Sequence, residues 1–368
     1  MRRKESLGIK VLSKLDPDFW RSKAVFVTGH TGFKGGWLSF LLSHFGANVS
    51  GFSLPPNTTP NFFELTRLRA RLGDSHIADI RDFEVLSTAL NKSDPEIIFH
   101  LAAQPLVRLS YADPLHTYTT NVLGTLNLLQ AARGCSSLRA VVIVTSDKCY
   151  ENLSWPWGYR ETDTLGGHDP YSNSKACQEL VVAGFRASYL RELGISVASA
   201  RAGNVIGGGD WSEDRLIPDV IRAHQMGKDL VIRNPSATRP WQHVLEPVCA
   251  YLTLAEKLFS STDFSSEWNF GPADRDVRSV QEVLKLASEQ LSGGLTWRNE
   301  TPAQELHEAK LLKLDCSKAH AYLGWKPRWG LEVAIEKTCD WYTQTALGQD
   351  AALLTEQQIR SFLSSPIL

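Results

Sequence analysis

The sequence predicts an α/β fold, in which a doubly wound parallel sheet is followed by a smaller, mixed C-terminal lobe. Strands that are apolar along their whole length alternate with helices as far as about Asn204. That alternation is typical of a parallel sheet covered by helices on both faces. After about Gly207 the pattern becomes irregular, with loop-like stretches and short helices, which indicates a second lobe.

Composition excludes several classes of protein. The 368 residues are 43% hydrophobic, enough for a sizeable core, and the length predicts two domains or one domain with an appended lobe. A net charge of -1 gives no overall field toward nucleic acid or an acidic surface. No apolar run approaches the ~20 residues of a membrane span, and the charged N-terminal run RRKE has no apolar region behind it, as a secretory signal would. Six cysteines without a CxxC pair predict reduced thiols in a cytoplasmic protein and no metal site.

Local signals place the elements of the sheet region. A β-branched apolar run that ends in glycine, Lys23–Gly29, predicts the first buried strand. Apolar residues at helical spacing and a glycine stop predict the helix that follows. Pro170 opens a later, long helical pattern. The predicted order is strand 23–29, helix 35–47, strand 48–54, strand 96–104, helix 116–134, strand 138–147, helix 170–193 and strand 195–205.

The second lobe is predicted from weaker signals. The stretches GGGDW (207–211) and RNPSATRPWQHV (233–244) mix Pro, Gly and polar residues and are expected to be loops. Shorter helices are expected over 248–259 and 279–291. The domain prediction is therefore residues 1–206, with return segments from about 240–275, for the first domain and the rest of 207–368 for the C-terminal lobe.

A glycine-rich turn between the first strand and the first helix carries the first functional signal. TGHTGFKG places Gly29, Gly32 and Gly35 in a GxxGxxG pattern. Glycines there allow a tight turn and close approach of the backbone to a pyrophosphate at the helix N-terminus. In this strand-turn-helix context they predict a dinucleotide site of the Rossmann type, the alternative being a structural glycine loop. The predicted cofactor-binding set also includes Thr31, Phe33, Lys34, Leu101, Ala102, Ala103 and Asn121.

The end of the second strand distinguishes the two nicotinamide cofactors. An acidic residue for the adenosine ribose is absent from GFSLPPNTTP, so Ser53 or Asn57 could substitute. The same stretch has no Arg or Lys for a 2'-phosphate, which favours NAD over NADP. In the DIRD stretch that follows, Asp79 and Ile80 are placed to contact adenine, unless Asp79 is a helix cap.

The stretch YSNSK supplies the catalytic signal. Tyr171 and Lys175 are four residues apart, so both project from one face of the long helix. An ammonium near a phenol lowers the pKa of the tyrosine toward neutrality. Such a tyrosine can take a proton from an alcohol as hydride leaves for a nicotinamide. The nucleotide loop and a strand that ends in Ser146 favour this interpretation over an ordinary exposed helix face.

Together these elements resemble the extended branch of the short-chain dehydrogenase/reductase family over nearly the whole chain. Motifs shared with that branch include HLAAQPLVRLSY, NVLGTLNLL, SARAGNVIGGGDW, RLIPDVI and WNFGP. Within the branch the sequence is similar to the bacterial CDP-glucose 4,6-dehydratases, including motifs of the second lobe. The motifs are TSDKCYEN, GYRE, DPYSNSK, RAGNVIGGGDW, RNPSATRPWQHVLEP and LKLDCSKA.

The resemblance implies a redox-neutral elimination on CDP-glucose with NAD. Tyr171 would take the sugar 4-hydroxyl proton as hydride passes from C4 to NAD, and Ser146 would hydrogen-bond that oxygen. The C4 ketone acidifies C5, so the C5 proton and the C6 hydroxyl leave as water, and hydride returns to C6. Asp147 would donate the proton to the leaving hydroxyl, as a desolvated carboxyl could. The product is CDP-4-keto-6-deoxy-glucose, a precursor of bacterial O-antigen dideoxysugars.

Lys148 is the position where the chain departs from its relatives. The dTDP-glucose enzymes carry a Glu there that removes the C5 proton, whereas this chain carries a lysine. A lysine can act as a base only when it is neutral. Otherwise Lys148 could position a water, pair with Asp147 or stabilise the enolate. The neighbouring Cys149 is expected to be a buried, inert thiol.

Substrate contacts follow from the resemblance and from side-chain chemistry, with ordinary surface ion pairs as the alternative. Guanidinium groups suit bidentate binding of a diphosphate. Segment 151–170, which is long, aromatic and glycine-bearing, is expected to be an active-site lid or else a plain surface loop. The predicted substrate-binding residues are Gln104, Arg108, Ser110, Asn204, Arg215, Arg239, His307 and Glu308.

Two other functions fit the same scaffold. A nucleotide-sugar 4-epimerase needs no acid at C6, so Asp147 argues against it. A non-catalytic NAD-sensing regulator tends to lack the Tyr/Lys pair, which is present here. Helix 116–134 and the helix of Tyr171 are expected to form a homodimer interface, with a tetramer left open.

Overall fold

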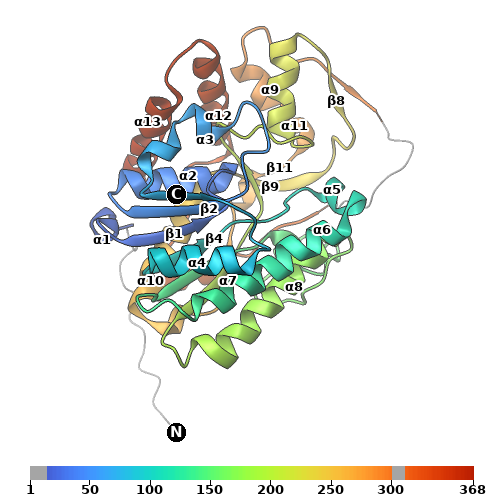
Figure 1. Cartoon of the computed structure of the whole chain (residues 1–368). Helices are drawn as coiled ribbons and strands as arrows, with labels where there is room; N and C mark the ends of the chain where they lie inside the picture. The colour runs from blue at the N-terminus through green and yellow to red at the C-terminus, as the bar shows by residue number, and fades with distance from the viewer. Residues whose placement is uncertain (1–14, 301–310) are drawn as a thin grey trace.

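The computed structural model describes residues 15–300 and 311–368, and a seven-stranded sheet runs through its centre (Figure 1). The strand order is β10-β6-β5-β4-β1-β2-β3, and every neighbouring pair is parallel. The predicted doubly wound sheet is therefore confirmed. Its strands are β1 (Ala24–Thr28), β2 (Asn48–Ser53), β3 (Asp74–Ile77), β4 (Ile97–His100), β5 (Ala140–Val144), β6 (Ser196–Ala202) and β10 (Glu267–Phe270).

Helices cover both faces of the sheet, because alternate residues of each strand point to opposite sides. Val25 and Val27 belong to a core beneath α2 and α10, whereas Phe26 between them packs against the core beneath α4, α7 and α8. The helices of these two layers are α2 (Phe33–His44), α4 (Phe83–Ser93), α7 (Gly124–Ala132), α8 (Pro170–Phe185) and α10 (Leu245–Ser260).

Two elements of the sheet region were missing from the sequence prediction. Strand β3 reads DSHI and is only partly buried, so it lacks the apolar run that marks the other strands. Helix α4 follows it and begins at an N-cap, Asp82, whose side chain accepts from Val85 N. Asp79 is therefore not the cap of this helix.

The two long helical patterns contain irregular turns. The predicted helix 116–134 is α6 (Pro114–Tyr118), a π-helical turn (Thr119–Leu123) and α7 in succession. The predicted helix 170–193 is α8 followed by a second π-helical turn, Arg186–Leu190. Asp169 caps α8 by accepting from Ser172 N, and Pro170 occupies its first turn.

The second lobe holds two small sheets, β11-β9-β7 and β12-β8. The expectation of a loop over 233–244 was wrong in part, because β9 (Thr238–His243) lies there between β7 (Asn204–Ile206) and β11 (Val277–Ser279). Pairing with strands distant in the sequence overrides its Pro-containing, polar composition. The other elements are β8 (Leu230–Ile232), β12 (Trp297–Asn299), α9 (Leu216–Met226), α11 (Val280–Gln290), α12 (Leu331–Ala346) and α13 (Ala351–Ser364).

The expectation that the later helices are shorter was also wrong. Helices α10 and α12 have 16 residues each, the same length as α8. Short segments complete the description: α1 (Pro17–Trp20), α3 (Phe62–Leu65), α5 (Val107–Ala112) and turns at Leu68–Arg71, Asp147–Cys149, Thr262–Phe264, Asp274–Asp276 and Ala319–Leu323. Within the described residues, no helix has the length and apolarity needed to cross a membrane.

A buried glutamate joins α10 to the chain before α12. The carboxylate of Glu246 accepts hydrogen bonds from the backbone N–H groups of Arg328 (2.9 Å) and Trp329 (2.7 Å). Its second oxygen has no partner among the described residues. Burial raises the pKa of Glu246 to about 8, and the two backbone hydrogen bonds oppose this shift.

We expect this glutamate to make stability fall with rising pH. A group whose pKa is raised on folding stabilises the protein fully below its unfolded pKa and loses that contribution as pH rises through the folded value. The melting temperature of Glu246→Gln minus that of the native protein should therefore be larger at pH ~9 than at pH ~5. Glu282→Gln is the control, because hydrogen bonds from Ser279 lower the pKa of Glu282 and its side chain is exposed. An equal difference at both pH values for Glu246→Gln would contradict the prediction.

Candidate active site

The glycine turn follows β1 and requires glycine at two positions. Gly29 has a φ of +78°, and a Cβ there would lie 2.8 Å from Ala102 N. A Cβ on Gly35 would lie 2.0 Å from the carbonyl oxygen of Gly29. Gly32 precedes α2, and no side chain caps the first turn of that helix. The turn therefore leaves backbone N–H groups at a helix N-terminus for an anionic ligand.

The end of β2 lies beside this turn. Thr31 Oγ1 is 2.8 Å from Ser53 Oγ and donates to the carbonyl oxygen of Leu54 (2.8 Å). Asn57 is exposed, so Ser53 is the better placed of the two predicted ribose partners. Asp79 forms an ion pair with Arg81, and the side chain of Ile80 is buried.

The ends of β1 and β4 are fastened together by residues that the sequence analysis did not single out. Thr28 Oγ1 is 2.7 Å from His100 Nδ1 and accepts from the backbone N–H groups of Leu101 and Ala102, each at 3.1 Å. The position of both residues at the ends of apolar strands was a signal that could have identified them. They fix the predicted cofactor-binding segment Leu101–Ala103 against the glycine turn.

Asn121 has a supporting position on the π-helical turn before α7. Its Oδ1 accepts from Gln104 N (2.8 Å), and its Nδ2 donates to Gln104 O (3.1 Å) and Ser174 Oγ (2.9 Å). Asn121, a predicted cofactor-binding residue, thus links the chain just after β4 to the helix of Tyr171 by hydrogen bonds.

Two residues predicted to line a sugar pocket have other roles. The amide of Gln104 is buried and bonded to Leu106 and Thr117. Ser110 is fully buried, and its hydroxyl accepts from the backbone N–H of Tyr171 at 3.1 Å. Their placement after a strand end suggested exposure to a ligand, but both side chains are buried, Gln104 before α5 and Ser110 on it. Gln104 therefore orders the strand end and Ser110 holds the start of α8, and their contact with the sugar stays a prediction.

The catalytic group predicted at the end of β5 assembles around a short turn. Ser146 Oγ donates to Asp147 Oδ1 (3.0 Å) and accepts from Lys148 N (3.2 Å). Ser146 also hydrogen-bonds the phenol of Tyr171, which is 8% exposed. Lys175 is buried one turn farther along α8, where its Nζ donates to Gln178 Oε1 at 2.9 Å.

The pKa expected for Tyr171 was wrong for the protein without a ligand. Burial raises the pKa of Tyr171 to about 12, and its hydrogen bond with Ser146 only partly opposes this shift. Burial and the nearby Lys34 lower the pKa of Lys175 to about 7. The lysine is therefore charged only in part at neutral pH, and sequence reasoning could not include the burial of both groups.

Asp147 is a buried acid, 2% exposed. Burial raises the pKa of this carboxyl, whereas the charge of Lys148 and the hydrogen bond from Ser146 oppose the shift. Its Oδ2 has no partner among the described residues. Such a carboxyl can hold a proton and donate it to a ligand.

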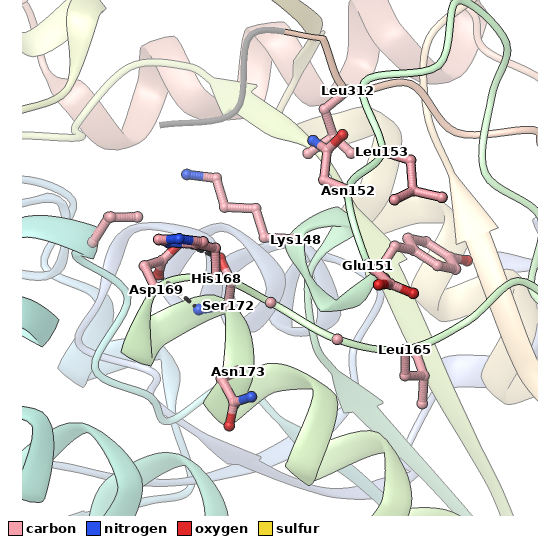
Figure 2. A pocket seen from close by; sticks show the side chains of 14 residues that line it. Lys148, Glu151, Asn152, Leu153, Leu165, His168, Asp169, Ser172, Asn173 and Leu312 are labelled. Atoms are coloured by element: carbon pink, nitrogen blue, oxygen red, sulfur yellow. Dashed lines mark hydrogen bonds between the residues drawn. The ribbon is translucent and has the colours of Figure 1, made fainter. Parts of the chain in front are cut away.

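Lys148 has a different environment from its neighbour. It is partly exposed and lines a cavity of about 460 Å³ between segment 151–170, the start of α8 and Leu312. Figure 2 shows its side chain projecting into this cavity, with Asn152 and His168 around it. Of these two adjacent residues, Asp147 is therefore enclosed by protein, whereas Lys148 faces the cavity.

Several cations surround the catalytic group. Lys34, in the first turn of α2, is close enough to lower the pKa of Asp147. Arg239 lies buried on β9 and lowers the same pKa, and Arg215 lies close enough to Tyr171 to lower the pKa of that phenol. Arg215 also forms an ion pair with Asp210 at 2.8 Å. A site with this many cations suits a diphosphate.

The remaining predicted residues are scattered. Asn204 lies on β7 and is partly exposed. Arg108 lies at the surface with its NH1 3.6 Å from Asp214 Oδ1, which is the ordinary ion pair considered as the alternative. His307 and Glu308 lie outside the described residues. Cys149 is buried as expected, and burial raises the pKa of its thiol well above the usual range, which favours an inert thiol.

Comparisons with known proteins agree with this geometry. A sequence model of the family described as GDP-mannose 4,6 dehydratase matches residues 26–338. The chain is 48% identical over 357 residues to the CDP-glucose 4,6-dehydratase of Salmonella typhimurium, covering 95% of this chain and 99% of that protein. It is 25% identical to the dTDP-glucose 4,6-dehydratase of Haemophilus influenzae, covering 86% and 97%.

Solved structures share the fold. MoeE5 in complex with UDP-glucose and NAD superposes with a TM-score of 0.74 at 26% identity, covering 88% of this chain and 99% of that one. The UDP-glucose 4-epimerase of Thermotoga maritima superposes with a TM-score of 0.76 at 22% identity, with the same coverage, which shows the fold alone. The family match and the 48% identity over nearly the full length of the chain confirm the resemblance that the motifs predicted. The chain therefore belongs to the GDP-mannose 4,6 dehydratase family of nucleotide-sugar dehydratases.

Proposed function

We propose that the chain is an NAD-dependent hydro-lyase that converts CDP-glucose to CDP-4-keto-6-deoxy-glucose. The observation that carries this proposal is the 48% identity to a CDP-glucose 4,6-dehydratase over 95% of the chain. The buried acid at Asp147, beside Ser146 and Tyr171, supports it because elimination at C6 needs a proton donor.

The residues around the glycine turn fit NAD. Gly29 and Gly35 allow the turn to pack closely on itself and on the end of β4, since a Cβ at either position would meet backbone atoms. The first turn of α2, which no side chain caps, leaves backbone N–H groups for a pyrophosphate. Ser53 lies where the ribose hydroxyls would be held, and residues 53–60 contain no Arg or Lys for a 2'-phosphate. When bound, NAD would accept hydride from C4 and return it to C6.

Different side chains act at the 4-hydroxyl, at C5 and at the leaving C6 hydroxyl. Tyr171, as the phenolate, takes the proton of the 4-hydroxyl, and Ser146 holds the same oxygen by a hydrogen bond. Asp147 donates its proton to the C6 hydroxyl as it leaves. Lys148 receives the C5 proton with its amine in the neutral form, and its open cavity gives that proton a way to solvent. Arg215 and Arg239 bind the diphosphate.

Each of the two lobes would bind one of the two ligands, NAD or the nucleotide sugar. Residues 1–206, with the return segments from about 240–275, would bind NAD, and the rest of 207–368 would bind the nucleotide sugar. Two return elements support this division: α10 packs on the face of the large sheet, and β10 forms its edge beside β6.

A 4-epimerase on the same scaffold is the second candidate, and one assay separates the two. The purified protein is incubated with CDP-glucose, and the product is examined by mass spectrometry for loss of water, with NADH absorbance followed in parallel. We expect a 4-keto-6-deoxy sugar without net NADH. A CDP-hexose of unchanged mass but inverted C4 would favour the epimerase, and turnover of UDP- or dTDP-glucose alone would overturn the assigned substrate.

Lys148 gives a separate prediction. Lys148→Ala should slow exchange of the C5 proton with solvent by about 100-fold, because no other base at this carbon is proposed. Lys148→Glu should restore part of that exchange, since a carboxylate is the base at this position in the dTDP-glucose enzymes. The measurement is deuterium incorporation at C5 by NMR. Full exchange in the alanine variant would make Lys148 a supporting residue rather than the base.

A homodimer, or a tetramer built from it, is the proposed assembly. Helices α6, α7 and α8 lie side by side at one edge of the molecule (Figure 1). They expose large apolar side chains, among them Leu115 at 74% and Leu180 at 63%. Light scattering should give a dimer or tetramer mass, and Leu180→Asp should reduce it to the monomer. A monomeric native protein would contradict the proposal.

The cytoplasm is the proposed location. The cysteines are free throughout the described residues, where all six of them lie, as expected in a reducing compartment. Nucleotide-sugar substrates for bacterial O-antigen synthesis would be available there.

A further inference from the structure

One buried polar network holds both ends of the turn that carries the catalytic group. The segment Thr145–Tyr150 contains Ser146, Asp147 and Lys148. Thr145 Oγ1 donates to Glu179 Oε1 at 2.5 Å, and the hydroxyl of Tyr150 accepts from Arg201 NH1 at 2.8 Å. Neither Glu179 nor Arg201 belongs to the proposed catalytic or ligand-binding set.

Glu179 lies on α8, four residues beyond Lys175, and its carboxylate is fully used. Besides Thr145, it accepts from Ser199 Oγ at 2.6 Å and from Arg201 Nε and NH2, each at 2.9 Å. The side chains of Glu179 and Arg201 are 1% and 2% exposed. The two parallel hydrogen bonds of a bidentate pair fix the relative orientation of its partners. Loss of either partner would leave the other as an unpaired buried charge.

Arg201 extends the network from β6 to the lid segment, residues 151–170. Its NH1 also donates to the carbonyl oxygen of Glu161 at 3.2 Å, and its guanidinium lies 4.9 Å from the ring centre of Tyr150. The Tyr150 hydroxyl in turn donates to Asn269 Oδ1 at 2.7 Å. Arg201 therefore touches α8, the catalytic turn and the lid segment at once.

The ring of Tyr150 begins an aromatic column through the lid segment. Tyr150 stacks on Tyr159 with ring centres 5.2 Å apart, and Tyr159 stacks on Trp155 at 5.3 Å. Trp157 continues the column at 5.3 Å from Trp155 and is 59% exposed. The position of Tyr150 is thus fixed by its hydroxyl on one side and by its ring on the other.

The two halves of the reaction depend on this network to different degrees. Tyr171 lies on a 16-residue helix whose first turn is held by Asp169 and Ser110, independently of Tyr150. Lys148, by contrast, lies on a three-residue turn, and the end of that turn is held by Tyr150. A shift of Tyr150 would therefore displace Lys148 and Asp147 more than Tyr171.

We propose that Arg201, held by Glu179 and acting through Tyr150, is a positioning residue for the elimination step at C5 and C6. This inference rests on the proposed dehydratase function. It assigns no contact with substrate or NAD to Arg201.

The test compares two tyrosines of the same stack. Tyr150→Phe removes the hydroxyl that joins the turn to Arg201. Tyr159→Phe removes a hydroxyl whose partners, among the described residues, are Asn152 and the N–H of Leu153 in the lid segment. Each variant is assayed for kcat, KM, transient bound NADH and deuterium exchange at C5. Tyr150→Phe should lower kcat about 30-fold with KM within about 2-fold, since small misplacements of a catalytic group cost up to ~100-fold.

The pattern of intermediates separates positioning from a general loss of structure. In Tyr150→Phe, bound NADH should accumulate while C5 exchange slows, because oxidation at C4 outpaces elimination. Tyr159→Phe should behave like the native protein, and Arg201→Lys should show the Tyr150→Phe pattern more strongly. Equal slowing of oxidation and elimination in Tyr150→Phe, or the same effect in Tyr159→Phe, would overturn the proposal. Should Arg201→Lys fail to fold, Tyr150→Phe keeps the ion pair and decides alone.

The native protein in the same assay tests the proposed function separately. If it converts no CDP-glucose, the dehydratase proposal fails. The positioning of the turn is then measured by hydrogen exchange of the amides of residues 146–150 without substrate. Faster exchange in Tyr150→Phe than in Tyr159→Phe supports the anchoring role of Arg201, and equal rates overturn it.

Discussion

Tyr171→Phe is expected to lower kcat for CDP-glucose by about 10²–10⁴-fold, the range typical of a lost general base. The phenylalanine ring fills the same buried space, but no group remains to take the proton from the 4-hydroxyl. That loss corresponds to roughly 3–5 kcal/mol of transition-state stabilisation. Rapid mixing with CDP-glucose should show no transient NADH.

Binding provides the check on this first prediction. Tyr171→Phe should bind CDP-glucose within a few-fold of the native affinity by calorimetry, because the phenol makes one contact among many. Tyr189→Phe is the matched control, since Tyr189 lies in the π-helical turn that continues the same helix and is 43% exposed. Full activity of Tyr171→Phe would remove this tyrosine from the mechanism.

Asp147→Asn is expected to stop the reaction at a later point. The amide has the shape of the protonated carboxyl but no acidic proton, so the C6 hydroxyl leaves poorly, and kcat should fall about 10²–10³-fold. Because Tyr171 and Ser146 are retained, oxidation at C4 should continue, and bound NADH should accumulate to nearly one equivalent of active sites.

The control for the second prediction is another carboxyl with a raised pKa. Burial raises the pKa of Asp219, which forms an ion pair with Arg222 on α9, and it belongs to no proposed catalytic group. Asp219→Asn should show neither accumulation of NADH nor a large loss of kcat. If Asp147→Asn turned over at the native rate, another acid would have to protonate the leaving group.

The features of the candidate site that follow from the sequence are those that it encodes locally. Gly29 and Gly35 are required by a tight turn between adjacent elements, and Tyr171 and Lys175 share one helix face. Such relations depend on a few neighbouring residues. A resemblance to known dehydratases then added Asp147, whose burial no local pattern shows.

The parts that could not be predicted depend on contacts between distant segments. Glu179 and Arg201 meet because α8 packs against β6, and nothing in either local sequence indicates the pair. Strand β9 exists because β7 and β11 lie on either side of it. The raised pKa of Tyr171 likewise arises from burial by several elements, which outweighs the hydrogen bond with Ser146 and the charge of Arg215.

The return of β10 to the large sheet has a consequence for how the chain folds during synthesis. Strand β6 has β5 on one side, and its other side is covered only by β10, which lies some 65 residues later in the sequence. Until residue 270 has left the ribosome, β6 is an open sheet edge, and the apolar face beneath α10 is uncovered. The first half of the chain should therefore be aggregation-prone while it is being synthesised, and we expect it to depend on chaperones.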